Sequence, residues 1–134
     1  MQREKTKPFS PDDVITALLA FLPPEFSNDP EKIHTTIRKL QQKEEYKDLI
    51  GDFEFLDYPR FPYSPLLGRI LNRLQESRLL SSRNPDYRVY QVKPASRDAI
   101  ESYYLEEGKI LYEQRGKLKQ IASELERELK SGES

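Results

Sequence analysis

Three proline residues constrain the fold of this chain more than any other feature, because each follows a residue that can cap a helix. The three pairs are Ser10-Pro11, Asp29-Pro30 and Ser64-Pro65. A side-chain oxygen at the cap accepts a hydrogen bond from the first helical turn, and proline suits the first helical position because its φ angle is already helical. The sequence therefore predicts that a helix begins at each of these prolines.

The apolar residues that follow each start predict how far the helices extend. The first apolar stripe stops at Pro23-Pro24, since a proline ring blocks continuation of the helix. The second helix, or two helices with a bend between them, extends to Gly51. The third has a strong stripe of leucine and isoleucine and ends near Ser77. All three are expected to bury one face and expose the other.

Residues 51–63, between the second and third helices, are rich in aromatic side chains. Five aromatic residues and two prolines fall within these thirteen positions. Phe53 and Phe55 alternate with acidic residues, which predicts a short strand followed by a loop held by aromatic packing. The phenylalanines are expected to complete the core. For Tyr58 and Tyr63 two roles stay open, packing and stacking against the bases of single-stranded nucleic acid.

A hairpin and a long helix are predicted for the rest of the chain. Asn84-Pro85-Asp86 is a turn sequence, and the segments around it predict a hairpin over residues 79–92. The last helix is expected to run from about residue 95 to 130, with apolar side chains at heptad spacing. Such spacing favours pairing with a second subunit, although the same side chains would also suit packing on the domain itself. The residues expected in a dimer seam are Ile100, Tyr104, Leu111, Leu118, Ile121 and Leu125.

Basic residues gather between Arg60 and Arg97, and this stretch has a net charge of +6. Residues 1–59 carry −4 and residues 98–134 carry −3, so the whole chain has a formal charge of −1. Because the chain as a whole is weakly acidic, attraction to nucleic acid would have to come from this local patch.

Over about half of the chain, the order of motifs follows a known pattern. An apolar run from Leu67 to Leu80 is followed by a basic turn, by the strand sequence Tyr87-Arg88-Val89-Tyr90-Gln91-Val92 and by the long helix. This pattern resembles the winged-helix regulators of the PadR and MarR kind. The resemblance implies a mainly helical α+β fold, with a winged-helix domain and its small hairpin wing at residues 1–94. It also implies a dimerisation helix at residues 95–134.

The third helix of a winged helix enters the major groove of DNA, and the hairpin lies along the backbone. Arginine can hydrogen-bond to guanine and asparagine to adenine, so Arg69, Asn72 and Arg73 are the expected base-recognition residues. Contacts with phosphates are expected from Arg60, Arg83, Arg88 and the backbone N–H groups of the helix start at Ser64. The leading hypothesis is a dimeric transcriptional regulator that binds double-stranded DNA.

An acidic protein partner is the alternative to DNA. A helix-turn-helix has a turn of a few residues before its recognition helix, whereas about thirteen residues separate Ile50 from Ser64. The alternative hypothesis is therefore an interaction module with a winged-helix core, such as an antitoxin or an accessory subunit. Its arginines and aromatic segment would bind the acidic partner.

Residues that could carry catalysis or hold a metal are scarce in this sequence. The chain has no cysteine and one histidine, His34, which is expected on a helix surface. No glycine-rich phosphate loop or catalytic serine motif occurs, so we expect no enzyme activity, cofactor or metal site. The N-terminus has no apolar signal-peptide core, and no apolar run is long enough to cross a bilayer. A cytoplasmic location without membrane contact is therefore expected.

Overall fold

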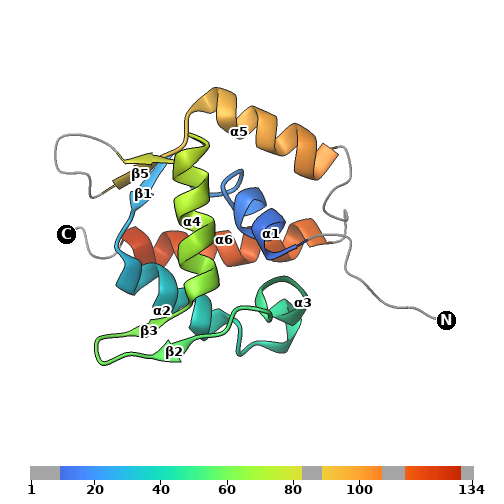
Figure 1. The fold of residues 1–134 in the computed structure, drawn as a ribbon. Coiled ribbons are helices and arrows are strands. Elements are labelled where there is room, and N and C mark those ends of the chain that lie inside the picture. The colour runs from blue at the N-terminus through green and yellow to red at the C-terminus, as the bar shows by residue number, and fades with distance from the viewer. Residues whose placement is uncertain (1–9, 83–88, 107–113, 131–134) are drawn as a thin grey trace.

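The structure, a computed structural model, describes residues 10–82, 89–106 and 114–130 (Figure 1). It is mainly helical and has two small antiparallel sheets, which confirms the expected α+β class. The helices are α1 (Pro11–Leu18), α2 (Pro30–Leu40), α3 (Lys47–Ile50), α4 (Pro65–Glu76), α5 (Pro94–Ile100) and α6 (Arg115–Lys130), with a 3₁₀ turn, η1, at Glu44–Tyr46 and a π-helical stretch, η2, at Glu101–Glu106. None of these helices in the described part of the chain is long and apolar enough to cross a membrane.

The three predicted helix starts are confirmed. The Ser10 hydroxyl accepts a hydrogen bond from the Asp13 N–H, and the Asp13 carboxylate accepts one from the Ser10 N–H, which together form a capping box. Asp29 and Ser64 cap α2 and α4, and each accepts a hydrogen bond from a backbone N–H of the first turn. Local capping therefore sets where α1, α2 and α4 begin.

The second predicted helix is divided into α2 and α3, so the version with a bend is the one that forms. The chain leaves α2 at Leu40, turns through η1 and forms the short α3. The Gln41 side-chain amide lies just after α2 and donates hydrogen bonds to the carbonyl oxygens of Ile50 and Phe53, both at 2.9 Å. This side chain fixes the end of α3 against the end of α2.

The main sheet is antiparallel and has the strand order β1-β5-β4. Strands β4 (Ser81–Ser82) and β5 (Val89–Gln91) are the paired strands of the hairpin predicted over residues 79–92, whose turn at 83–88 lies outside the described residues. The sequence did not predict β1 (Glu25–Ser27), which comes between α1 and α2 and pairs with β5. Phe26 of β1 packs edge-on against Tyr90 of β5, with ring centroids 5.8 Å apart.

The aromatic segment forms a second hairpin, which consists of β2 (Leu56–Asp57) and β3 (Pro62–Tyr63). The strand predicted at Phe53 and Phe55 is wrong, because both residues precede β2. Phe53 is buried and Phe55 packs against the core, so the expected packing role of these two rings is confirmed. The hairpin lies against α2 through β3.

The single helix predicted over residues 95–130 is wrong. The helical stretch of α5 and η2 is described as far as Glu106, and α6, which starts at Arg115, lies on a different part of the molecule and does not continue its direction (Figure 1). Both η2 and α6 contact α1, and α6 also contacts α2 and β1. The region predicted as an appended helix therefore contributes to the same core as the rest of the chain.

The apolar residues of this region face that core, which corrects the predicted dimer seam. Four of them are at most 4% exposed within the single chain: Ile100, Leu118, Ile121 and Leu125. Tyr104 packs against the same core. Leu111 lies outside the described residues. The buried side chains of α6 lie against α1, α2 and β1, and Ile100 of α5 is buried in the same core. Packing on the domain, the alternative to a dimer seam, therefore accounts for these four residues.

Candidate nucleic-acid interface

Helix α4 has one buried face and one exposed polar face. Leu67, Ile70 and Leu74 are buried against the core. The side chains predicted for base recognition, Arg69, Asn72 and Arg73, are all exposed, so the sequence assigned the two faces correctly. In the view of Figure 1, α4 lies in front of the other helices. The β2–β3 hairpin is at its N-terminal end, and the sheet of β1 and β5 is towards its C-terminal end.

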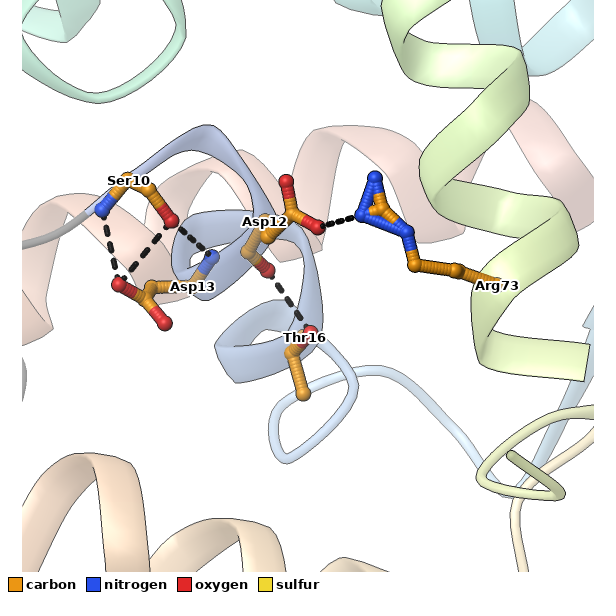
Figure 2. A network of polar contacts seen from close by, with 5 residues as sticks. All are labelled: Ser10, Asp12, Asp13, Thr16 and Arg73. Atoms are coloured by element: carbon orange, nitrogen blue, oxygen red, sulfur yellow. Dashed lines mark hydrogen bonds and ion pairs between the residues drawn. The ribbon is translucent and has the colours of Figure 1, made fainter. Parts of the chain in front are cut away.

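Arg73 forms an ion pair with α1, which the sequence did not predict. Its Nη1 atom lies 2.6 Å from Oδ2 of Asp12, and both side chains are about half exposed. Figure 2 shows the guanidinium pointing from α4 towards the first turn of α1, next to the capping box of Ser10 and Asp13. An exposed ion pair contributes roughly 0–1 kcal/mol to stability. The main effect of this pair is therefore to orient the guanidinium.

Arg60 and Arg69 are exposed and less constrained than Arg73. Arg60 lies between β2 and β3, and Arg69 lies in the second turn of α4. Within the described ranges, neither guanidinium has a hydrogen bond or an ion pair. Arg83 and Arg88, the other arginines expected at phosphates, lie outside the described residues.

Ser64 is the one predicted phosphate contact that the structure contradicts. The residue is fully buried, and its backbone N–H donates a hydrogen bond to Nδ1 of His34 at 3.0 Å. Its hydroxyl accepts from the Leu67 N–H. Because these groups already have partners inside the protein, Ser64 has no backbone donor left for a phosphate.

His34 is also placed differently from the prediction, since it is buried and only 1% exposed. Its ring stacks on Tyr63 at a centroid distance of 4.5 Å, and the rings of Phe55 and Phe61 lie near it. Since Nδ1 accepts a hydrogen bond, the imidazole is neutral and carries its proton on Nε2. Burial disfavours the charged form and lowers the pKa of His34 from 6.5 to about 4.

Two other arginines of the basic stretch have structural roles. Arg97 donates a hydrogen bond to the carbonyl oxygen of Leu22, just after the end of α1. Arg78 follows α4 with a φ angle of 68°, and the chain reverses there towards β4. Some arginines of the basic stretch therefore stabilise the fold and are not part of a binding surface. The residues best placed for an external partner are Arg60, Arg69 and Asn72.

Two features of the described residues bear on the binding of a metal or a cofactor. Within the described ranges, no group of three or more histidine, cysteine, aspartate or glutamate side chains is placed to hold a metal ion. A cavity of about 30 Å³ lies among α1, α2, α4 and α6 with an apolar lining. Ligand pockets are far larger, at roughly 300–1,000 Å³.

Comparisons of the chain with models of protein families, with curated proteins and with solved structures found no match.

Proposed function

We propose that this chain is a winged-helix protein that binds double-stranded DNA through the exposed face of α4. The observation that carries the proposal is the exposure of Arg69 and Asn72 on the helix that leads directly into the β4–β5 hairpin. A recognition helix followed by a hairpin is the arrangement in which winged helices bind the major groove and the adjacent backbone. Strand β1 pairs with β5 and so anchors the hairpin beside the helix.

The side chains on this face have the chemistry that base recognition needs. Arg69 and Asn72 are three positions apart on α4, so they are neighbours on the helix surface. Arginine can donate two hydrogen bonds to guanine, and asparagine can pair with adenine in the same groove. Arg73 adds a guanidinium whose direction is set by Asp12. Arg60 and the wing arginines Arg83 and Arg88 would contact phosphates, and recognition of a DNA site in this way would suit a transcriptional regulator.

An acidic protein is the second candidate partner, and the pair of Arg73 with Asp12 is the observation that favours it. This ion pair shows that the α4 face accepts a carboxylate at 2.6 Å within the chain itself. A partner with exposed aspartate or glutamate would repeat that contact at Arg69. Only the first candidate requires the chain to bind duplex DNA, so a DNA-binding experiment distinguishes the two.

Selection from a random pool of duplexes of about 20 base pairs, followed by anisotropy measurements at about 50–200 mM salt, tests the proposal. The wild-type chain is expected to enrich a sequence, with a slope of log K against log salt near −4 to −5 if about five phosphates are contacted. Arg69→Ala should weaken binding to the selected duplex roughly 5- to 150-fold, the equivalent of losing about 1–3 kcal/mol of base discrimination.

Arg127→Ala is the matched control, because Arg127 is 67% exposed on α6, outside the proposed interface. Its duplex affinity should stay at the wild-type value. No measurable duplex binding at about 50 mM salt would contradict DNA as the partner and leave the acidic protein. Unchanged affinity of Arg69→Ala would instead show that α4 is not the recognition helix.

A further inference from the structure

Three aromatic rings form a parallel stack that runs from the core to the surface of the β2–β3 hairpin. The innermost ring is His34, which stacks on Tyr63 at 4.5 Å and an interplanar angle of 19°. Tyr63 in turn stacks on Tyr58 at 5.9 Å, also at 19°. His34 is buried, whereas Tyr58 is 52% exposed. Tyr58 therefore stacks on Tyr63 and still has about half of its surface accessible to a ligand.

The two inner rings of the stack, His34 and Tyr63, are fixed to the start of α4, and Tyr63 supports the outer ring of Tyr58. His34 accepts a hydrogen bond from the N–H of Ser64, the residue that caps α4. The Tyr63 hydroxyl lies against the first turn of α4 at Gly68, where a Cβ atom would overlap it. Gly68 is next to Arg69 in the chain, so the stack packs against the N-terminal half of the helix that carries Arg69.

Tyr58 has the surroundings of a base-stacking site. Arg60 lies two residues further on, is exposed and has no hydrogen bond or ion pair within the described ranges, so it is available for a phosphate. Aromatic rings beside a cation bind unpaired bases, because every nucleobase has a π face. An exposed aromatic ring whose other face belongs to a rigid stack loses little conformational entropy on binding.

The acidic residues of the β2–β3 hairpin limit how much single-stranded nucleic acid can lie along it. Glu54 and Asp57 are exposed on this segment, and Asp57 lies 3.7 Å from Arg38. A long single strand along the hairpin would bring its phosphates close to these carboxylates. A single unpaired base on Tyr58, with the phosphates on the side of Arg60 and Arg69, avoids that repulsion.

We propose that Tyr58 stacks on an unpaired base at the end of a duplex whose paired part lies on α4. This inference rests on the proposed function and narrows its ligand to DNA that carries a junction between double and single strands. The three groups that bind it are the Tyr58 ring for the base, Arg60 for the adjoining phosphate and the α4 face for the duplex.

The test compares a blunt duplex with the same duplex extended by about four unpaired thymidines, by anisotropy at about 50 mM salt. The wild-type chain is expected to bind the extended duplex roughly 5- to 100-fold more tightly, as stacking of one base on an aromatic side chain would give. Tyr58→Ala should lose this preference and keep the blunt-duplex affinity, while Tyr58→Phe should keep both. Tyr103→Ala is the matched control, since Tyr103 is 50% exposed on η2, and it should behave as the wild type.

The outcomes separate this inference from the proposed function. If the wild-type chain binds both ligands equally, or if Tyr58→Ala keeps the preference, the stacking site is overturned while duplex binding stands. If the blunt duplex does not bind but the extended one does, and Tyr58→Ala abolishes it, the stacking site is supported and duplex recognition by α4 is overturned. If neither ligand binds, both proposals fall. Circular dichroism of each variant checks that it is folded.

Discussion

The position of His34 depends on a contact that no local pattern reveals. In the sequence it is a polar residue of an amphipathic helix, and such residues are mostly exposed. In the structure the β2–β3 hairpin covers a second face of α2, so His34 is buried. The imidazole keeps a hydrogen bond by accepting the Ser64 N–H. This one side chain thereby joins α2, β3 and the start of α4.

Burial of a neutral histidine makes the protein less stable in acid. The pKa of His34 is about 4 in the folded chain and 6.5 in the unfolded chain, so below pH 6.5 only the unfolded chain takes up the proton. The free energy of unfolding should therefore fall as the pH decreases from 6.5 towards 4. Between about pH 7.5 and 5.5 the expected loss is roughly 1 kcal/mol. Urea denaturation at the two pH values measures it.

His34→Asn provides the control for this pH dependence. Asparagine places an acceptor near the position of Nδ1 but does not titrate in this range. The variant should be less stable than the wild type at about pH 7.5, because the ring contacts are lost. It should also lack the loss of roughly 1 kcal/mol at lower pH. The same loss in both chains would show that other groups cause the acid sensitivity.

At the scale of elements, helix α4 ends in a Schellman motif with an unusual residue. The Leu79 N–H donates to the Leu74 carbonyl oxygen and the Arg78 N–H to that of Gln75, both at 3.0 Å. Arg78 has a φ angle of 68°, which places it in the left-handed region that glycine adopts without steric cost. The motif thus leads the chain from α4 into β4 at the expense of some backbone strain.

Replacing Arg78 by glycine should relieve that strain. Arg78→Gly is expected to raise the free energy of unfolding by about 0.5–1 kcal/mol, which is the steric gain less the greater flexibility of glycine in the unfolded chain. Arg78→Ala removes the charge but keeps the Cβ atom, so it should change stability by less than about 0.5 kcal/mol. Urea denaturation of the three chains provides the comparison. A destabilised Arg78→Gly would indicate that the arginine side chain itself stabilises the turn.

Elements with local signals were predictable, and elements that depend on distant partners were not. Caps followed by proline located the starts of α1, α2 and α4, since a cap acts within its own first turn. Strand β1 has three residues and is defined by its pairing with β5, more than sixty positions later in the chain. The different placement of η2 and α6 was missed for another reason. Heptad spacing is the same for a coiled-coil seam and for two helices that pack on one core.

At the scale of the whole molecule, charge in sequence does not equal charge on one surface. Helical periodicity correctly assigned Arg69, Asn72 and Arg73 to the exposed face of α4. It could not show that Arg73 pairs with Asp12, sixty-one positions earlier. Nor could it show that Arg97 binds a carbonyl oxygen near the end of α1. The candidate interface is therefore smaller than the basic stretch, and it is extended by an aromatic hairpin.

Helix α6 contributes to the stability of the whole fold. It contacts α1, α2 and β1, and its apolar side chains are part of their shared core. Leu118 is fully buried there. Leu118→Ala is expected to lower the free energy of unfolding by about 2–5 kcal/mol, from lost burial and from the cavity that remains. Ser123 lies exposed on the same helix, so Ser123→Ala should have an effect within about 0.5 kcal/mol.

Protein concentration distinguishes a core helix from a dimer seam. If Leu118 packs within one chain, the denaturation midpoints of the wild type and of Leu118→Ala should not depend on concentration, and light scattering should give the same mass for both. If Leu118 lay between two subunits, the substitution would lower the mass, and both midpoints would rise with concentration by mass action. A stable, lighter Leu118→Ala would therefore contradict the buried position of α6. A folded chain lacking residues 115–130 would contradict it independently, since removal of α6 would uncover the apolar faces of α1 and α2.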